Sequence, residues 1–315
     1  MSVLDKIKTA KRPLFTFELL PPLKGHSIDR IYRTIDSLME YEPAYINFTS
    51  HRNEVILKER PDGLIEKRTM RKRPGTVALA AAVRYKYDVT VVPHILCGGF
   101  TKEETENVLI DMHFLGINDV LALRGDPPRG SRTFVPEDDG HSYSSDLVKQ
   151  IADMNNGSYL DDVDSTPTSF CIGVAGYPEK HIEAANIKAD LARLKEKIDA
   201  GGDYIVTQMF FDNNKYYDFV KMVREIGIDV PVIPGIKPVA ALNDVNLLPQ
   251  TFNIDLPDEL VKELSKCKTN EQAHEVGIEW TTMQSKDLLK NKVPGIHYYT
   301  LGASDNISRI VRASY

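Results

Sequence analysis

The chain has 315 residues, with 39 Lys and Arg against 45 Asp and Glu, so its formal charge at pH 7 is −6. Apolar residues make up 42% and charged residues 27%, a composition typical of globular proteins and not of disordered or fibrous ones. The acidic balance argues against a protein that binds nucleic acid or an anionic membrane over a large surface. No apolar stretch approaches the length of a membrane helix, and residues 1–13 lack the apolar core of a secretory signal.

The three cysteines are far apart in the sequence, and no Cys-x-x-Cys or His-Glu-x-x-His motif occurs. We therefore expect neither a disulfide framework nor a structural zinc site, and we predict no metal site. The expected protein is cytoplasmic and reduced, with no nucleic-acid or membrane partner.

Short apolar runs rich in β-branched and aromatic residues alternate along the chain with longer segments of helical period. The predicted strands are 14–20, 44–49, 89–96, 119–123, 169–175, 204–208, 232–235 and 295–300. The helices predicted between them are 27–41, 76–87, 101–115, 145–155, 182–200, 215–226 and 304–313, with two or three more in 241–291.

This alternation of strands and helices indicates a parallel sheet. Eight strands at a mean spacing of about 40 residues favour a closed (β/α)8 TIM barrel in the α/β class, with an open doubly wound sheet as the alternative. No linker or repeat divides the chain, so we predict a single catalytic domain over 1–315, with an N-terminal extension at 1–13. The longest irregular segment, 124–143, is predicted to be a long active-site loop.

Polar residues end most of the predicted strands, where a barrel builds its active site. These residues are Glu18, Thr49, His94, Arg124, Asp126, Tyr177, Gln208 and Tyr299. Glu18 lies inside an apolar run, where an ionised carboxylate is costly unless it is paired. It is either a salt-bridged structural residue or a carboxyl group in a partly dry pocket, where burial raises its pKa so that it holds a proton near neutrality.

The other strand-end residues also allow two interpretations. His94 can be a hydrogen-bonded core histidine, and Arg124-Gly125-Asp126 can be a tight turn. Gln208 must be hydrogen-bonded by the backbone or by a ligand.

Asp190 and Lys197 run beside an apolar stripe in the predicted helix 182–200, either as a solvated edge or as a phosphate- or ribose-binding edge. The sequence contains no Gly-x-Gly-x-x-Gly, Walker A or Gly-x-Ser-x-Gly motif. A bound dinucleotide is therefore not held by a Rossmann turn.

Four motifs taken together resemble the bacterial methylenetetrahydrofolate reductase family. They are T-F-E-L-L-P-P from residue 16, L-R-G-D-P-P from residue 123, A-G-Y-P-E-K-H from residue 175 and A-G-G-D-Y-I-V-T-Q-M-F-F-D from residue 200. The resemblance extends from about residue 13 to the end of the chain.

The resemblance implies a (β/α)8 barrel that binds FAD tightly without a Rossmann motif. It implies an oxidoreductase acting on CH–NH, which reduces 5,10-methylenetetrahydrofolate to 5-methyltetrahydrofolate with NADH or NADPH by ping-pong hydride transfer. Such an enzyme of one-carbon metabolism feeds methyl groups to methionine synthesis. We also expect a homo-oligomer.

The resemblance further implies roles for individual residues. Glu18 would be the general acid that protonates N10 of the folate, and Asp126 would lie near the flavin and the pterin and stabilise a cationic iminium. Gln208 would hydrogen-bond the folate, and Tyr299 would join the substrate contacts. The implied FAD contacts are Thr49, His94, Arg124, Gly125, Asp126, Ser144, Tyr177, His181, Asp190 and Lys197.

The chain departs from the family pattern at several positions around the implied ligands. These are Ala303 and Asp244 at folate contacts, Ser50 and Arg52 beside the flavin and nicotinamide, and Arg193 and Glu196 among FAD contacts. They bear on how the glutamate tail of folate is held and on the electron donor. Two other readings remain open: a folate- or phosphate-handling transferase or lyase without flavin, and a non-catalytic binding or scaffold barrel.

Overall fold

The main sheet is a parallel barrel, seen in a computed structural model that describes residues 1–128, 130–131, 133–161, 165–300 and 304–315. Its strands are β1 (Leu14–Leu19), β2 (Tyr45–Phe48), β5 (Thr90–Leu96), β6 (Asp119–Leu123), β7 (Cys171–Gly176), β8 (Tyr204–Thr207), β9 (Val232–Ile233), β10 (Gly235–Ile236) and β11 (Gly295–Tyr299). Their order is β10-β11-β1-β2-β5-β6-β7-β8-β9, and the paired neighbours run parallel. Only Pro234 separates β9 from β10, and proline cannot donate to the ladder. Strands β9 and β10 therefore act as one barrel strand, which brings the two ends of the sheet together. The predicted eight-strand TIM barrel is confirmed.

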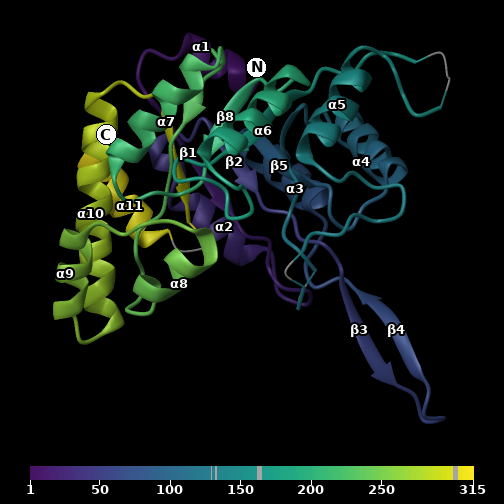
Figure 1. Cartoon of the computed structure of the whole chain (residues 1–315), viewed down its shortest axis with the longest axis horizontal. Coiled ribbons are helices and arrows are strands. Elements are labelled where there is room, and N and C mark those ends of the chain that lie inside the picture. Colours follow the sequence, from purple (N-terminus) through teal and green to yellow (C-terminus); the bar gives the residue numbers. More distant parts are fainter. Residues whose placement is uncertain (129, 132, 162–164, 301–303) are drawn as a thin grey trace.

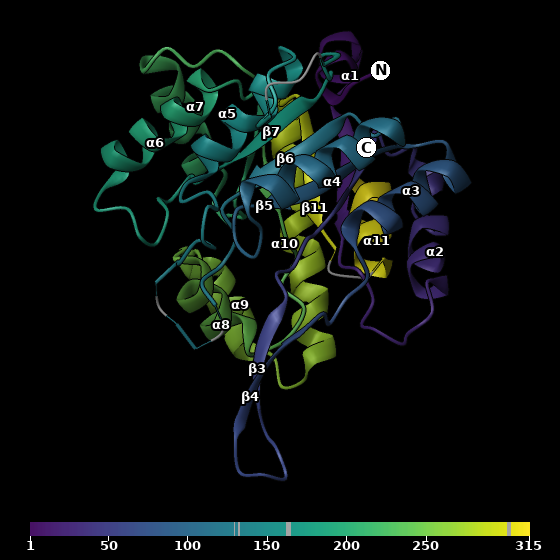
Figure 2. The ribbon, with the colours of Figure 1, turned by 90° about the vertical axis from the view of Figure 1, so that its right-hand side faces the viewer.

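Helices surround this barrel (Figures 1 and 2). They are α2 (Asp29–Asp36), α3 (Thr76–Tyr87), α4 (Lys102–Phe114), α5 (Ser144–Asn155), α6 (Ile187–Asp199), α7 (Asn213–Glu225), α8 (Asp244–Phe252), α9 (Asp258–Lys266), α10 (Asn270–Lys290) and α11 (Asp305–Ser314). The predicted helix 27–41 is in fact α2 followed by a separate 3-10 turn, η1 (Met39–Tyr41). The predicted helix 182–200 begins only at Ile187, because the side chain of Asn186 accepts a hydrogen bond from Ala189 N and caps it there. Among the described residues, no helix is both long and apolar enough to cross a bilayer.

A short helix, α1 (Val3–Thr9), closes the amino-terminal end of the barrel. Val3 is completely buried and packs with side chains from the barrel interior, including Tyr45 and Tyr204. Its backbone N–H donates to Asp119 Oδ1 at 2.7 Å. The predicted N-terminal extension therefore plugs the end of the barrel opposite the carboxyl ends of the strands.

The two faces of the barrel strands differ in chemistry because successive residues of a strand point to opposite sides. On β1, Phe15 and Phe17 face outward into the hydrophobic layer under the helices. Thr16 and Glu18 face inward and are buried. This alternation places a polar layer inside the barrel, near the carboxyl ends of the strands.

A two-stranded antiparallel hairpin, β3 (Glu54–Glu59) and β4 (Ile65–Met70), follows β2 and was not predicted. It projects away from the barrel (Figures 1 and 2). The turn contains Asp62-Gly63, with Gly63 at φ +76°, and an Asp-Gly pair between alternating residues is the local signal for such a hairpin. The described residues of the predicted loop 124–143 carry neither helix nor strand.

Candidate active site

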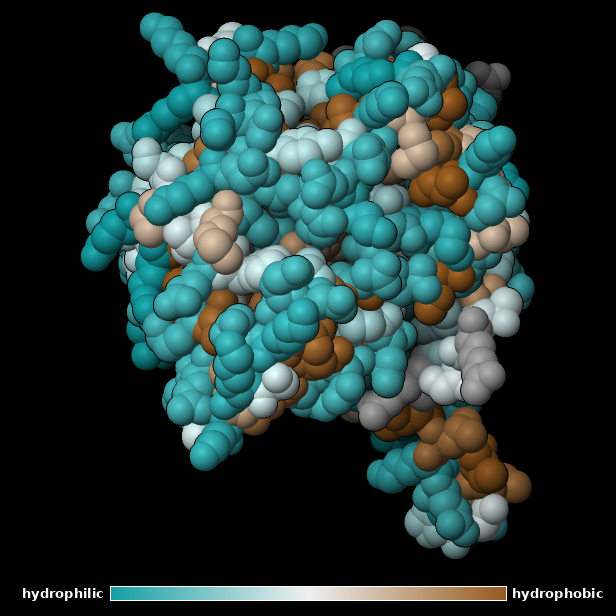
Figure 3. Space-filling model, turned by 60° about the vertical axis from the view of Figure 1, so that its left-hand side comes forward, coloured by the Kyte–Doolittle hydropathy of each residue, from teal (hydrophilic) through white to brown (hydrophobic). Residues whose placement is uncertain are grey.

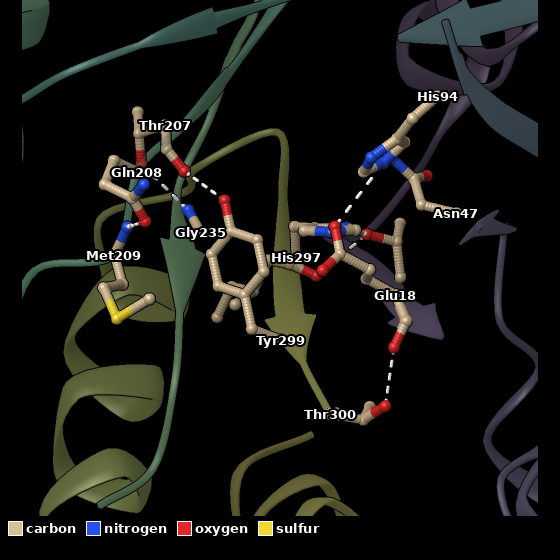
Figure 4. Close-up of polar contacts among 12 residues, drawn as sticks. Glu18, Asn47, His94, Thr207, Gln208, Met209, Gly235, His297, Tyr299 and Thr300 are labelled. Carbon is tan, nitrogen blue, oxygen red and sulfur yellow. Dashed lines mark hydrogen bonds and ion pairs between the residues drawn. The ribbon is translucent and has the colours of Figure 1, made fainter. Parts of the chain in front are cut away.

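The centre of the polar layer is the carboxyl group of Glu18 on β1, which is only 7% exposed. Its Oε2 lies 3.4 Å from His94 Nε2 on β5 and 3.9 Å from His297 Nε2 on β11. Its backbone carbonyl accepts a hydrogen bond of 2.6 Å from the Thr300 hydroxyl. Figure 4 shows the carboxyl group between the two imidazole rings. Since β1 pairs with β11 and β2, and β2 with β5, these side chains meet because of the sheet order.

Each imidazole is held in place by a second polar side chain. Thr16 Oγ1 lies 2.9 Å from His297 Nδ1, and Asn47 Nδ2 lies 3.3 Å from His94 Nε2. If the Thr16 hydroxyl donates to Nδ1, the proton of a neutral His297 ring resides on Nε2, which points at Glu18. His297 Nε2 is buried and makes no hydrogen bond to a described residue, and Glu18 Oε2 lies 3.9 Å from it.

The charge state of Glu18 follows from two opposing effects. Burial raises the pKa of Glu18, but the neighbouring His297 and His94 imidazoles outweigh it, so the net pKa lies below its ordinary value. At 3.9 Å the contact between His297 Nε2 and Glu18 Oε2 is longer than a hydrogen bond, and it is an ion pair only when His297 is protonated. Burial lowers the pKa of His94 to about 4. Near neutral pH we therefore expect an ionised Glu18 beside a neutral His94. The prediction that burial gives Glu18 a raised pKa is wrong for this structure, because imidazoles flank the carboxyl group.

Tyr299 on β11 is the register partner of Glu18 on the neighbouring β1, and its ring lies edge-on to that of His297 with centroids 5.2 Å apart. Gln208 lies on the far side of Tyr299 from Glu18 (Figure 4). The Tyr299 hydroxyl donates to Thr207 O at 2.6 Å. The side-chain oxygen of Gln208 accepts from Met209 N at 2.9 Å, so the side chain folds back on its own loop. These two predicted substrate contacts therefore share the barrel mouth with Glu18 but do not touch it.

Four other predicted residues form a cluster at the rim between β7 and α6. Asp190 accepts a hydrogen bond from His181 N at 2.9 Å, and the ring of His181 lies edge-on to Tyr177 with centroids 4.7 Å apart. Lys197 Nζ donates to Ala175 O and lies 5.9 Å from the centre of the Tyr177 ring. Burial lowers the pKa of Lys197 to about 8. The helix edge is therefore not a solvated charged face.

Arg124 joins this rim from the end of β6. Its guanidinium pairs with Glu183 at 2.7 Å and lies 4.9 Å from the centre of the Phe134 ring. Burial, and then the positive charge of Arg124, lower the pKa of His181. A guanidinium, a buried ammonium and an imidazole within one cluster form a donor set suited to phosphate oxygens.

The remaining predicted contacts are distributed around the mouth. Gly125 has φ +84°, a left-handed conformation that favours glycine, and the exposed Asp126 follows it. Thr49 follows β2, and its hydroxyl oxygen is buried without a hydrogen-bond partner among the described residues. Ser144 is the half-buried first residue of α5; no described contact brings it to Glu18.

The positions that depart from the family pattern have local partners. Arg52 pairs with Glu137 at 2.9 Å, and its Nη1 is buried without a described partner. Asp244 accepts from the backbone N–H groups of residues 240 and 241 and lies 3.7 Å from Lys237 Nζ. Arg193 and Glu196 form an exposed pair at 2.8 Å, and Ser50 directly follows Thr49. Ala303 lies outside the described residues.

Sequence reasoning missed three members of the central cluster: Thr16, Asn47 and His297. All three lie two residues before a predicted site residue, and side chains two apart in a strand share one face. Applying the alternation backward from Glu18, Thr49 and Tyr299 would have found them.

The two described cavities are separate from this cluster. One, of about 440 Å³, is lined by residues of α4 and α5 and by the segments next to them. The other, of about 390 Å³, lies around Trp280 and Asp212. Neither is lined by Glu18 or its histidines. In the part of the chain that the structure describes, no group of three His, Cys, Asp or Glu residues is placed to hold a metal ion.

Comparison with known proteins adds to this geometry. A methylenetetrahydrofolate reductase (NADH) of Arabidopsis thaliana is 32% identical over 96% of this chain, which spans 48% of that protein. The 5,10-methylenetetrahydrofolate reductase of Escherichia coli is 29% identical over 92% of this chain and 86% of its own length. The chain thus spans about half the length of the plant relative but most of the bacterial one.

A solved structure of an uncharacterized Clostridium thermocellum protein that binds two copies of 5-methyl-5,6,7,8-tetrahydrofolic acid has a TM-score of 0.58. It covers 98% of this chain and 97% of its own at 14% identity, and it supports the fold alone. The profile of the family described as methylenetetrahydrofolate reductase matches residues 3–314, which is nearly the whole chain. This chain therefore belongs to the methylenetetrahydrofolate reductase family.

Proposed function

We propose that this chain reduces 5,10-methylenetetrahydrofolate to 5-methyltetrahydrofolate, with FAD as its cofactor and NADH or NADPH as electron donor, in the cytoplasm. Family membership and the names of its relatives support the reaction. The observation that carries the proposal is the buried carboxyl–imidazole cluster at the carboxyl ends of β1, β5 and β11.

The rim residues fit a flavin dinucleotide. When bound, FAD supplies the redox chemistry, accepting a hydride from the nicotinamide and passing it to the folate. Lys197, Arg124 and His181 offer donors to a pyrophosphate. Arg124 is paired with Glu183, so binding requires it to exchange one anionic partner for another. The buried, unpartnered hydroxyl of Thr49 offers a further hydrogen bond.

The central cluster handles the proton that the folate ring needs. Protonation of N10 weakens its bond to the bridging methylene and leaves a 5-iminium cation that can accept hydride. An ionised Glu18 must first receive a proton. A protonated His297, whose Nε2 lies 3.9 Å from Glu18 Oε2, is placed to supply it and returns to its neutral form. Thr16 fixes the ring orientation through Nδ1. Glu18 therefore transfers the proton to N10, and His297 reprotonates Glu18.

Charge and hydrogen bonding around the mouth complete the proposed site. The carboxylate of Asp126, exposed at the end of β6, would stabilise the positive charge of the iminium. Gln208 and Tyr299, at the same mouth as Glu18, would bind the polar edge of the folate, with the Gln208 side chain leaving Met209 N to do so.

Anaerobic spectroscopy of the purified protein tests this function. The protein should be yellow with bound FAD, NADH or NADPH should bleach it, and 5,10-methylenetetrahydrofolate should restore the colour. A colourless protein that binds folate and cannot be reconstituted with FAD would instead favour a transferase or lyase on the same barrel.

A further inference from the structure

Lys237 lies in the same layer of the barrel mouth as Glu18. Strand β10 pairs with β11 so that Lys237, the residue after the last ladder pair, comes alongside Tyr299. Tyr299 is in turn the register partner of Glu18. The preceding Ile236 packs in the hydrophobic layer under the helices, and because successive strand residues point to opposite sides, Lys237 is directed to the barrel interior. Three adjacent strands, β10, β11 and β1, thus each contribute one polar side chain at this level.

The ammonium group of Lys237 is buried but loosely held. Its side chain is only 10% exposed. Its Nζ donates to Pro238 O at 3.3 Å and lies 3.7 Å from Asp244 Oδ2. Both distances exceed the range of about 2.7–3.2 Å that is usual for an N–H···O hydrogen bond. An ammonium group has three N–H donors, and in the described part of the chain none of them makes a hydrogen bond shorter than 3.3 Å.

Asp244, the neighbouring carboxylate, is engaged elsewhere. Its Oδ2 accepts hydrogen bonds from the backbone N–H groups of Ala240 and Ala241 at 2.8 and 3.2 Å, ahead of α8. These two contacts hold the carboxylate against the backbone and not against Lys237. Burial lowers the pKa of Lys237, and the charge of Asp244 opposes that effect. A buried ammonium group with so distant a counter-charge is stabilised by a further anion.

The spacing of the strands matches the shape of the proposed substrate. Neighbouring strands lie about 4.8 Å apart, so β10 and β1 are about 10 Å apart across β11. In 5,10-methylenetetrahydrofolate a p-aminobenzoyl group separates N10 from the glutamate, and its length is of the same order. With N10 at Glu18, the glutamate carboxylates therefore come within reach of the long, flexible side chain of Lys237.

We propose that Lys237 is a specificity-determining residue of the proposed reaction, and that its ammonium group binds a carboxylate of the folate's glutamate. This assignment rests on the proposed function, and Lys237 is not among the contacts that the family resemblance implies. Binding replaces the long contact to Asp244 with a charge-assisted hydrogen bond to the ligand. Because Lys237 delivers no proton, its removal should weaken folate binding and leave reduction of the protein by NADH or NADPH unchanged.

A ligand that lacks the glutamate tests this contact directly. Isothermal titration of the FAD-loaded protein compares 5-methyltetrahydrofolate with 5-methyltetrahydropteroate, and the wild type should bind the folate about ten- to hundredfold more tightly. Lys237→Met should bind both ligands alike, with the wild-type affinity for the pteroate, which also shows that the variant is folded. Lys237→Gln, a second variant that keeps a donor without the charge, should lose the same preference. Lys237→Arg keeps the cation and should retain a preference for the folate.

The matched control is Lys286→Met, which removes the same charge from an exposed position of α10. This helix lies on the side of the molecule that comes forward in Figure 3, where the surface is mainly hydrophilic. The control should keep the wild-type preference. A wild type that turns over folate but binds both ligands alike, or a Lys237→Met variant with the full preference, would overturn the assignment alone. A wild type that binds neither ligand and whose reduced flavin is not oxidised by 5,10-methylenetetrahydrofolate would overturn the proposed function as well.

Discussion

Replacing Thr16 by Val tests the positioning of His297 with almost no change in side-chain volume. Thr16 is completely buried, and its hydroxyl is the polar contact of His297 Nδ1 at 2.9 Å. Leaving one buried hydrogen-bonding group unsatisfied costs about 1–3 kcal/mol. If that cost falls on the proton-delivering geometry, and about 1.4 kcal/mol corresponds to tenfold in rate, the folate half-reaction should slow about five- to hundredfold.

Stopped-flow measurement of the two half-reactions separates this effect from general damage. Reduction of the enzyme by NADH or NADPH should stay within about twofold of wild type, because that step needs no proton from His297. Thr16→Ser keeps the hydroxyl and should restore most of the folate rate. An equal loss in both half-reactions, or no loss in either, would show that the contact between Thr16 and His297 does not serve proton delivery.

Three further predictions concern the rim and the barrel floor. Asp126→Asn should lower folate turnover more than oxidation of the nicotinamide, as separate steady-state assays with folate and with an artificial acceptor would show; the reverse order would refute the role of its charge. Lys197→Met should weaken FAD retention about ten- to hundredfold, measured by fluorescence titration, whereas Lys195→Met, a change in the half-exposed Lys195–Asp199 pair, should not. Burial raises the pKa of Asp119 to about 6 from 3.8, so ionisation costs the folded state up to about 3 kcal/mol. Because this cost develops as pH rises through that range, Asp119→Asn should raise the free energy of unfolding in urea at about pH 8 and leave it unchanged near pH 3; a variant that is less stable at both would contradict the pKa.

The barrel could be predicted because its signals are local. Each barrel strand is a short apolar run followed by a segment with helical periodicity. This pattern persists even where Pro234 divides one strand into β9 and β10. Element ends were less predictable, since side-chain caps such as that of Asn186 set them. The hairpin β3–β4 escaped prediction because its one apolar run, residues 55–57, is only three residues long and is followed and preceded by charged side chains. Its Asp62-Gly63 turn was the one available signal.

The sequence predicted which strand ends carry the site residues, but it did not predict which side chains those residues contact. The position of Glu18 at the end of an apolar run indicated burial, and burial alone predicted a raised pKa. The pairing of β1 with β11, which joins chain segments about 280 residues apart, brings His297 beside Glu18 and reverses the direction. Such long-range neighbours are set by sheet closure, which no local pattern contains.

The substitution Glu18→Gln tests most directly whether Glu18 delivers the proton to N10 of the folate. The substitution keeps the size of the side chain and removes its ability to carry a proton to N10. The variant should bind FAD and be reduced by NADH or NADPH at close to the wild-type rate, while oxidation by 5,10-methylenetetrahydrofolate falls by at least about a hundredfold. If Glu18→Gln reduces the folate at the wild-type rate, or loses both half-reactions alike, Glu18 is not the proton donor of this enzyme.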